Sequence, residues 1–242
     1  MEAHKVKSGI PGLDAMLGGG FSRNSVVAVA GGTGSGRTIF LSQFLASGAV
    51  DFDEPGLFLS LDAQKESVYS SVASFGWDMM ELEREQKIVF IEYPQNELSA
   101  IAEQEGALRD LIGTLGIKRV VMDSITPYSL LFSTLEERRM NTLRLVNVVR
   151  GWKVTALISA ETAPSSEQEL PRTLSGVESF ADGFIHLSYL RRAGKRERAV
   201  EIVKMRGASH VHDVVPAQIT PHGFVVGALP SKKAKKENVP DE

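Results

Sequence analysis

Glycine is concentrated in one short stretch of the chain, residues 31–38, which reads GGTGSGRT. Glycines allow the backbone to wrap so that several N–H groups point at one anion, and the N-terminus of a following helix adds a favourable dipole. With one exception the stretch fits the pattern G-x-x-x-x-G-K-[ST], whose backbone cradles phosphates and whose last hydroxyl binds Mg²⁺. The spacing therefore predicts a phosphate-binding loop with Thr38 as a magnesium ligand. The competing interpretation is an ordinary glycine-rich turn between a strand and a helix.

The exception is Arg37, which occupies the position of the usual lysine. Arginine keeps the positive charge but replaces a compact ammonium group with a broad planar fork. Attraction to phosphate survives this change, whereas the wider group fits the β and γ oxygens less closely. The residues predicted to form the nucleotide-binding loop are Thr33, Gly34, Ser35, Gly36, Arg37, Thr38 and Ile39.

A second candidate residue, Asp123, directly follows the apolar run 120–122. An aspartate at the carboxyl end of a buried strand is where proteins with such loops hold magnesium. Many strands end in aspartate, so the residue alone says little. Together with the loop it carries weight, because the carboxyl ends of neighbouring parallel strands meet at one edge of a sheet. Thr38 and Asp123 are therefore the predicted metal residues.

The elements that position these residues alternate along the chain as far as about residue 183. Short apolar runs separated by helical stretches are typical of a parallel sheet covered on both faces. The predicted strands are 26–30, 57–61, 88–91, 120–122 and 154–158, and the predicted helices are 38–46, 65–75, 98–115 and 136–149. After them, strands at 184–190, 199–205, 217–220 and 224–226 are separated only by turns. We expect an α/β fold with a mainly parallel sheet and antiparallel strands at its C-terminal edge.

The composition excludes several classes of protein. With 43% hydrophobic and 24% charged residues the chain is globular, and its net charge of −3 gives no overall footprint for nucleic acid. The absence of cysteine excludes disulfides, thiolate zinc sites and cysteine nucleophiles. No apolar run approaches the ~20 residues of a membrane helix, and the N-terminus lacks the core of a signal peptide. We expect a cytoplasmic protein with one domain, residues 1–230, and a disordered Lys-rich tail, residues 231–242.

Several further segments, taken in order, resemble the KaiC-like branch of the RecA superfamily of ATPases. They span about residues 8–229 and look like a single-repeat archaeal member, whereas the circadian clock protein carries two repeats. Beyond the glycine-rich loop, the segments that carry the resemblance are SGIPGLD at 8–14, LGGG at 17–20, SFGWD at 74–78, DSIT at 123–126 and KMRGASH at 204–210.

The resemblance implies a RecA-like P-loop NTPase core that binds ATP and Mg²⁺ and assembles into a homo-oligomer, a hexameric ring with ATP between subunits. By analogy, basic residues of one subunit reach the nucleotide of its neighbour and stabilise charge on the transferred phosphoryl group. The residues matched to this role or beside it are Lys204, Met205, Arg206, Ser209 and His210. Periodicity alone favours a solvated strand face for Lys204 and Arg206, because they alternate with apolar residues.

The chain departs from that family at the end of its second strand. Members carry two glutamates there, and the first is taken to activate the attacking water, but this chain has Asp62 and Ala63. Asp62 is one methylene shorter than glutamate, and a displacement near 1 Å can cost about 10²-fold in rate. With Asp62 and Arg37 as the candidate catalytic residues, ATP hydrolysis is expected to be slow or absent. The alternatives are therefore a slow ATPase and an ATP-dependent regulatory or scaffold protein with an unknown protein partner.

A role in DNA repair or recombination is a third alternative. Two segments of the chain could bind DNA if this were its role. Residues 161–172 occupy the region where recombinases present DNA-binding loops, but here the segment is acidic and lacks aromatic residues. Single-strand binding needs basic grooves and stacking rings, so DNA as a partner is disfavoured. The basic turn 191–198 could contact nucleic acid, although a solvated turn that protects an edge hairpin is the favoured interpretation.

Overall fold

Nine strands form the main sheet, and residues 5–164, 169–192 and 194–228 are described by the computed structural model. The strands are β3 (Val26–Gly31), β4 (Gly56–Ser60), β5 (Ile88–Glu92), β6 (Arg119–Asp123), β7 (Thr155–Glu161), β8 (Gly183–Arg192), β9 (Lys195–Met205), β10 (Val215–Thr220) and β11 (Gly223–Val226). Their order in the sheet is β11-β10-β9-β8-β3-β7-β6-β4-β5. A smaller sheet pairs β1 (Lys5–Val6) with β2 (Phe21–Ser22).

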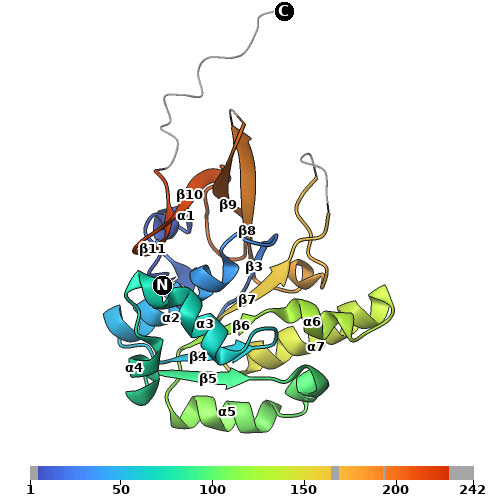
Figure 1. The fold of residues 1–242 in the computed structure, drawn as a ribbon. Coiled ribbons are helices and arrows are strands. Elements are labelled where there is room, and N and C mark those ends of the chain that lie inside the picture. The colour runs from blue at the N-terminus through green and yellow to red at the C-terminus, as the bar shows by residue number, and fades with distance from the viewer. Residues whose placement is uncertain (1–4, 165–168, 193, 229–242) are drawn as a thin grey trace, which may run out of the picture.

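The sheet is parallel from β8 to β5 and antiparallel from β9 to β11. This confirms the predicted fold class, including the antiparallel strands at the C-terminal edge. β8 and β9 form a long hairpin that projects from the body of the molecule (Figure 1). The phosphate loop follows β3, which lies between β8 and β7 in the middle of the sheet.

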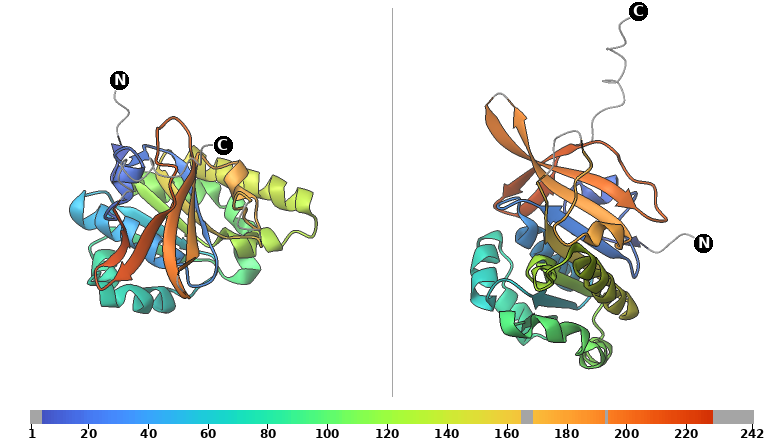
Figure 2. Two further views of the ribbon diagram at one scale, coloured as in Figure 1. Left: turned by 90° about the horizontal axis from the view of Figure 1, so that it is seen from above. Right: turned by 90° about the vertical axis from the view of Figure 1, so that its right-hand side faces the viewer.

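Helices cover both faces of this sheet (Figure 2). The α-helices are α1 (Leu13–Met16), α2 (Arg37–Asp51), α3 (Lys65–Val72), α4 (Met79–Arg84), α5 (Glu105–Thr114), α6 (Ile125–Leu130) and α7 (Leu135–Gly151). Short 3₁₀ segments are η1 (Ala73–Phe75), η2 (Gln95–Ala102) and η3 (Val177–Ser179).

The alternation of side chains along β3 divides the apolar core into two layers. Val27 and Val29 pack with α2, α3 and α4 on one face, whereas Val26, Ala28 and Ala30 pack with α5, α6 and α7 on the other. Every residue of β3 is buried. A strand covered on both sides reads as a continuous apolar run, which is why the sequence pattern predicted it.

Most predicted elements are present with slightly different ends, but the predicted helix 98–115 is wrong as one element. The chain forms η2, breaks at Glu103 and Gln104, and starts again as α5. Leu98, Ile101 and Leu108 are all buried in the same core layer, so the apolar spacing continues across the break. α4 and α6 were not predicted, because both are too short to show a helical period.

One strand begins with a buried cation. Arg119 is fully buried at the start of β6, where its Nε donates to Glu54 at 2.7 Å and its Nη1 donates to the Phe44 carbonyl at 2.9 Å. Its guanidinium also lies over the Phe44 ring, 4.6 Å from the centroid. Gly48 makes room for it, since a Cβ there would lie 2.4 Å from Arg119 Cδ. This cluster fixes α2 against β6, and both elements contribute to the site.

Two sequence-based expectations fall outside this description. The tail 231–242 lies outside the described residues, as does Ala193 of the basic turn. Among the described helices, none is both long and apolar enough to cross a membrane.

Candidate phosphate-binding site

The loop between β3 and α2 has the backbone geometry that an anion site requires. Gly34 and Gly36 adopt left-handed φ angles of 78° and 100°. Gly36 is also the N-cap of α2 and supplies no side-chain hydrogen bond, so the first N–H groups of the helix are left to face the loop. Gly31 is packed closely, because a Cβ there would lie 2.4 Å from Ser35 Oγ. Glycine is therefore needed at positions 34 and 36 for the left-handed backbone and at position 31 because a side chain would not fit.

The two predicted metal residues meet directly below the loop. Thr38 Oγ1 donates to Asp123 Oδ2 at 2.7 Å, and the Ser159 hydroxyl donates to the other oxygen of the same carboxylate. Asp123 is buried, and β7 separates its strand, β6, from β3. A hydroxyl and a carboxylate that converge at a helix N-terminus are ligands suited to Mg²⁺. Ser159 was not predicted from the sequence.

Arg37 points away from solvent at the mouth of the loop. Its side chain is only 14% exposed, and its Nη2 lies 3.5 Å from Glu161 Oε1 at the end of β7. Its Nη1 is buried without a hydrogen-bond partner among the described residues, as is the hydroxyl of Ser35. Buried donors without acceptors are costly, and phosphate oxygens would supply the missing acceptors. The residues present therefore fit a bound phosphate group.

Asp62 stands at the rim of the same site. The pKa of its carboxyl is raised above the usual value, first by burial and then by the charges of Asp123 and Glu161, while Arg37 opposes the shift. The segment that carries it is tied to the site, because the Leu61 N–H donates to the Asp123 carbonyl at 2.7 Å. The carboxylates of Asp62, Asp123 and Glu161 thus interact electrostatically beside the single guanidinium of Arg37, and the excess of negative charge favours an added cation.

A cavity of about 360 Å³ opens beside the loop. One wall comes from α3 and from Ala63 shortly before it, and the other comes from the C-terminal strands. From β8, Tyr189 Oη donates to the Gly34 carbonyl at 2.5 Å, and from β9, Arg198 Nη2 donates to the same carbonyl at 3.1 Å. Arg198 also lines the cavity. The sequence placed Arg198 in a solvated turn, so its contact with the loop was missed.

The KMRGASH segment lies at the other end of β3. Met205 is opposite Gly183 in the β8–β9 pair, and Gly183 lies beside Val27 near the start of β3. β3 has six residues, so its two ends are about 17 Å apart. Lys204 and Arg206 therefore do not lie beside the phosphate loop of their own chain. Met205, matched to the nucleotide site by resemblance, has its side chain in the apolar core.

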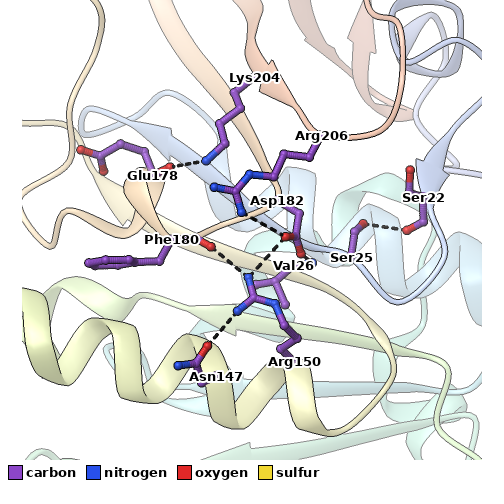
Figure 3. A network of polar contacts seen from close by, with 10 residues as sticks. All are labelled: Ser22, Ser25, Val26, Asn147, Arg150, Glu178, Phe180, Asp182, Lys204 and Arg206. Atoms are coloured by element: carbon purple, nitrogen blue, oxygen red, sulfur yellow. Dashed lines mark hydrogen bonds and ion pairs between the residues drawn. The ribbon is translucent and has the colours of Figure 1, made fainter.

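A polar network fixes Lys204 and Arg206 at that end (Figure 3). Lys204 Nζ donates to the Glu178 carbonyl at 3.0 Å, and Arg206 Nη1 lies 3.7 Å from Asp182 Oδ1. Arg150, from α7, donates to the same Asp182 oxygen at 3.3 Å. Burial and then the charge of Arg206 lower the pKa of the Lys204 ammonium.

Asp182 and the histidines complete the surroundings of this segment. The Asp182 Oδ2 atom accepts from the Val26 N–H at 3.0 Å, which ties the network to the first residue of β3. The ring of His210 lies 4.5 Å from that of His212, centroid to centroid, at a tilt of 57°, and its Nε2 is buried without a partner among the described residues. Ser209 is exposed. None of these residues contributes to the cavity beside the phosphate loop.

The first residue of the acidic segment 161–172 contacts the glycine-rich loop, and no described residue after it lines the cavity. Thr162 and Thr173 form an isolated antiparallel bridge, and Ala163 N–H donates to the Arg172 carbonyl at 2.8 Å. Residues 165–168 lie outside the described residues. Glu161, the first residue of the segment, forms an ion pair with Arg37. The sequence did not indicate this contact.

Comparisons with known proteins find relatives that match nearly the whole chain. The family model "ATPase: KaiC" matches residues 6–231. A UPF0273 protein of Methanocaldococcus jannaschii is 32% identical over 236 residues, which cover 92% of this chain and 96% of the relative. The circadian clock oscillator protein KaiC of Prochlorococcus marinus is 28% identical over 95% of this chain but only 48% of its own length.

A solved structure shows the same fold. The crystal structure of a KaiC-like protein from the hyperthermophilic archaeon Pyrococcus horikoshii superposes with a TM-score of 0.82 at 32% identity, over 93% of this chain and all of that chain. The match of the family model to nearly the whole chain confirms the resemblance carried by the ordered motifs. The chain therefore belongs to the KaiC ATPase family of the RecA superfamily.

Proposed function

We propose that the chain binds Mg-ATP at the phosphate loop and hydrolyses it slowly within a cytoplasmic homo-oligomer, a hexameric ring. Membership of the KaiC ATPase family supports nucleotide binding. The single observation that carries the proposal is the 2.7 Å contact of Thr38 with Asp123 beneath the uncapped N-terminus of α2. It joins a metal-type ligand pair to a set of free N–H groups, as phosphoryl transfer requires.

In this proposal each residue of the loop has a distinct task. The N–H groups of residues 33–39 and the guanidinium of Arg37 bind the phosphates, and Thr38 and Asp123 hold the metal. Mg²⁺, when bound, neutralises charge on the phosphate oxygens. Asp62 orients the attacking water and accepts its proton as the water oxygen bonds to the γ phosphorus. The bond from that phosphorus to the leaving oxygen of ADP breaks, which leaves ADP and phosphate.

The second half of the site comes from the neighbouring subunit in this proposal. Lys204 and Arg206 lie too far from the loop of their own chain to contact its phosphates, and their placement at the opposite end of β3 favours a role in trans. His210 follows in the same segment and would act with them. Cations supplied in trans stabilise charge that develops during phosphoryl transfer. Met205 and Ser209 would support this segment at the interface, Met205 from within the core.

The test combines three measurements on one purified sample with Mg²⁺: ATP hydrolysis, bound nucleotide and molecular mass. We expect turnover from a ring that contains ATP or ADP. Thr38→Ala and Asp123→Asn should abolish the Mg²⁺ dependence of binding, whereas Thr114→Ala, a hydroxyl deletion on the exposed end of α5, should not. A monomer that binds no ATP in the presence of Mg²⁺ would refute the proposal.

A second function is favoured by a specific departure from the family. Arg37 replaces the loop lysine, and Asp62 followed by Ala63 replaces the two acidic residues. ATP would then set the oligomeric state or the affinity for a protein partner, without useful turnover. A ring that retains unhydrolysed ATP supports this function. Wild-type turnover equal to or above that of a variant with both Arg37→Lys and Asp62→Glu argues against it. DNA as a partner remains disfavoured.

A further inference from the structure

The backbone of Glu161 lies beside that of Gly31, the first glycine of the phosphate loop. Glu161 is the last residue of β7 and pairs with Gly31 in the parallel register of β3 and β7. Its own N–H donates to the Thr126 hydroxyl at 2.9 Å, which holds its backbone from the side of α6. Its carboxylate is therefore presented to the loop by two independent contacts of the main chain.

The two terminal nitrogens of Arg37 have different surroundings. Nη2 lies 3.5 Å from Glu161 Oε1, whereas Nη1 is buried without a partner among the described residues. A guanidinium is a rigid planar fork, so fixing one nitrogen also fixes the direction of the other. The ammonium of a lysine has three rotating donors and would gain no such direction from the same carboxylate.

We propose that Glu161 is a positioning residue for Arg37, which holds one nitrogen of the guanidinium so that the other is aimed at the phosphate. The inference rests on the proposed binding of ATP at this loop. It explains how a chain without the usual loop lysine retains a directed phosphate donor. Arg37 and Glu161 form a pair in which the carboxylate supplies the orientation that the longer side chain would otherwise lack.

Glu161 is too weak a partner to keep Arg37 from a phosphate. Its side chain is 42% exposed, and pairs of this kind shift an equilibrium by about fivefold or less. A phosphate with two negative charges and several acceptor oxygens competes well with one carboxylate. The contact therefore restricts the side chain of Arg37 without blocking the loop.

The experiment measures the affinity for Mg-ATP by equilibrium titration in a double-mutant cycle of Glu161→Ala and Arg37→Ala. We expect Glu161→Ala to weaken binding about fivefold, and Glu161→Gln less than about twofold, because the amide oxygen keeps a polar contact for Nη2 at the same position. In the Arg37→Ala background, Glu161→Ala should not weaken binding. Glu103→Ala, an exposed glutamate before α5, is the matched control and should change nothing.

Two results would overturn the positioning role while leaving the proposed function intact. Tighter binding by Glu161→Ala would make the carboxylate a competitor of the phosphate. An equal loss in both backgrounds would mean that Glu161 acts without Arg37. Wild-type protein that binds no ATP would overturn the positioning role and the proposed function together. Thermal unfolding of each variant, with Glu161→Gln as the isosteric form, separates these results from loss of the fold.

Discussion

Asp62→Glu is the substitution that tests the proposed water-activating group most directly. The backbone on either side of Asp62 is fixed, since Leu61 N–H donates to the Asp123 carbonyl at 2.7 Å and Ala63 N–H donates to the Ser60 hydroxyl at 3.3 Å. A longer side chain at this position therefore moves the carboxylate and not the chain. The added methylene extends its reach by about 1 Å, the scale on which a misplaced catalytic group loses about 10²-fold in rate.

We therefore expect Asp62→Glu to raise kcat by about 10²-fold, which lowers the activation free energy by about 2.7 kcal/mol. The charge at the position is unchanged, and the carboxylate acts on water and not on the bound phosphates. KM for ATP should therefore change by less than about threefold. A rise in kcat with little change in KM is the signature of a group that acts in the transition state.

The assay is steady-state phosphate release with saturating Mg²⁺, compared among wild type, Asp62→Glu and the nearly isosteric Asp62→Asn. Asp62→Asn should lie below wild type, because an amide cannot accept the proton of water. The reasoning is refuted if Asp62→Glu binds ATP normally and turns over no faster than wild type. Equal rates for all three proteins would remove Asp62 from the mechanism.

Three further predictions concern stability and partners. Partial burial and the charges of Asp123 and Glu161 raise the pKa of Asp62, which is still exposed to solvent, so its ionised form slightly destabilises the nucleotide-free fold. Asp62→Asn should therefore raise Tm slightly at neutral pH, and thermal melts should show this gain vanish below about pH 4, where the unfolded aspartate is also protonated. Gly48→Ala should cost about 2 kcal/mol in denaturant unfolding by displacing Arg119, whereas Gly113→Ala, with open space around it, should be neutral or stabilising. Single-stranded DNA should not bind at about 0.15 M salt in a fluorescence anisotropy titration, and binding that weakens as salt rises would restore DNA as a partner.

The position of the glycine-rich loop and the approach of Thr38 to Asp123 could be predicted because they depend on local spacing and one general rule. The glycine pattern is confined to residues 31–38. Asp123 follows from the meeting of carboxyl ends in a parallel sheet, although β7 lies between β6, which carries Asp123, and β3, which leads into the loop before Thr38. That rule needs the strands to be parallel and close, and the alternation of strands and helices supplied this information.

The remaining contacts depend on strand order, which periodicity does not give. Glu161 reaches Arg37 only because β7 lies beside β3, and Arg198 reaches Gly34 only because the β8–β9 hairpin lies on the other side. The burial of Arg119 was not predicted, since nothing in the sequence shows that Gly48 leaves space for it. In each case the missing information is a contact between segments far apart in the chain.

The separation of the phosphate loop from the KMRGASH segment has a consequence for symmetry. Two copies related by a two-fold axis would bring like surfaces together, whereas the proposed contact between the phosphate loop of one subunit and the KMRGASH segment of the next would join unlike surfaces. Such a heterologous contact either closes into a ring or continues as an open filament, in which one terminal subunit has an incomplete site. Closure thus decides whether every site in the assembly is equivalent.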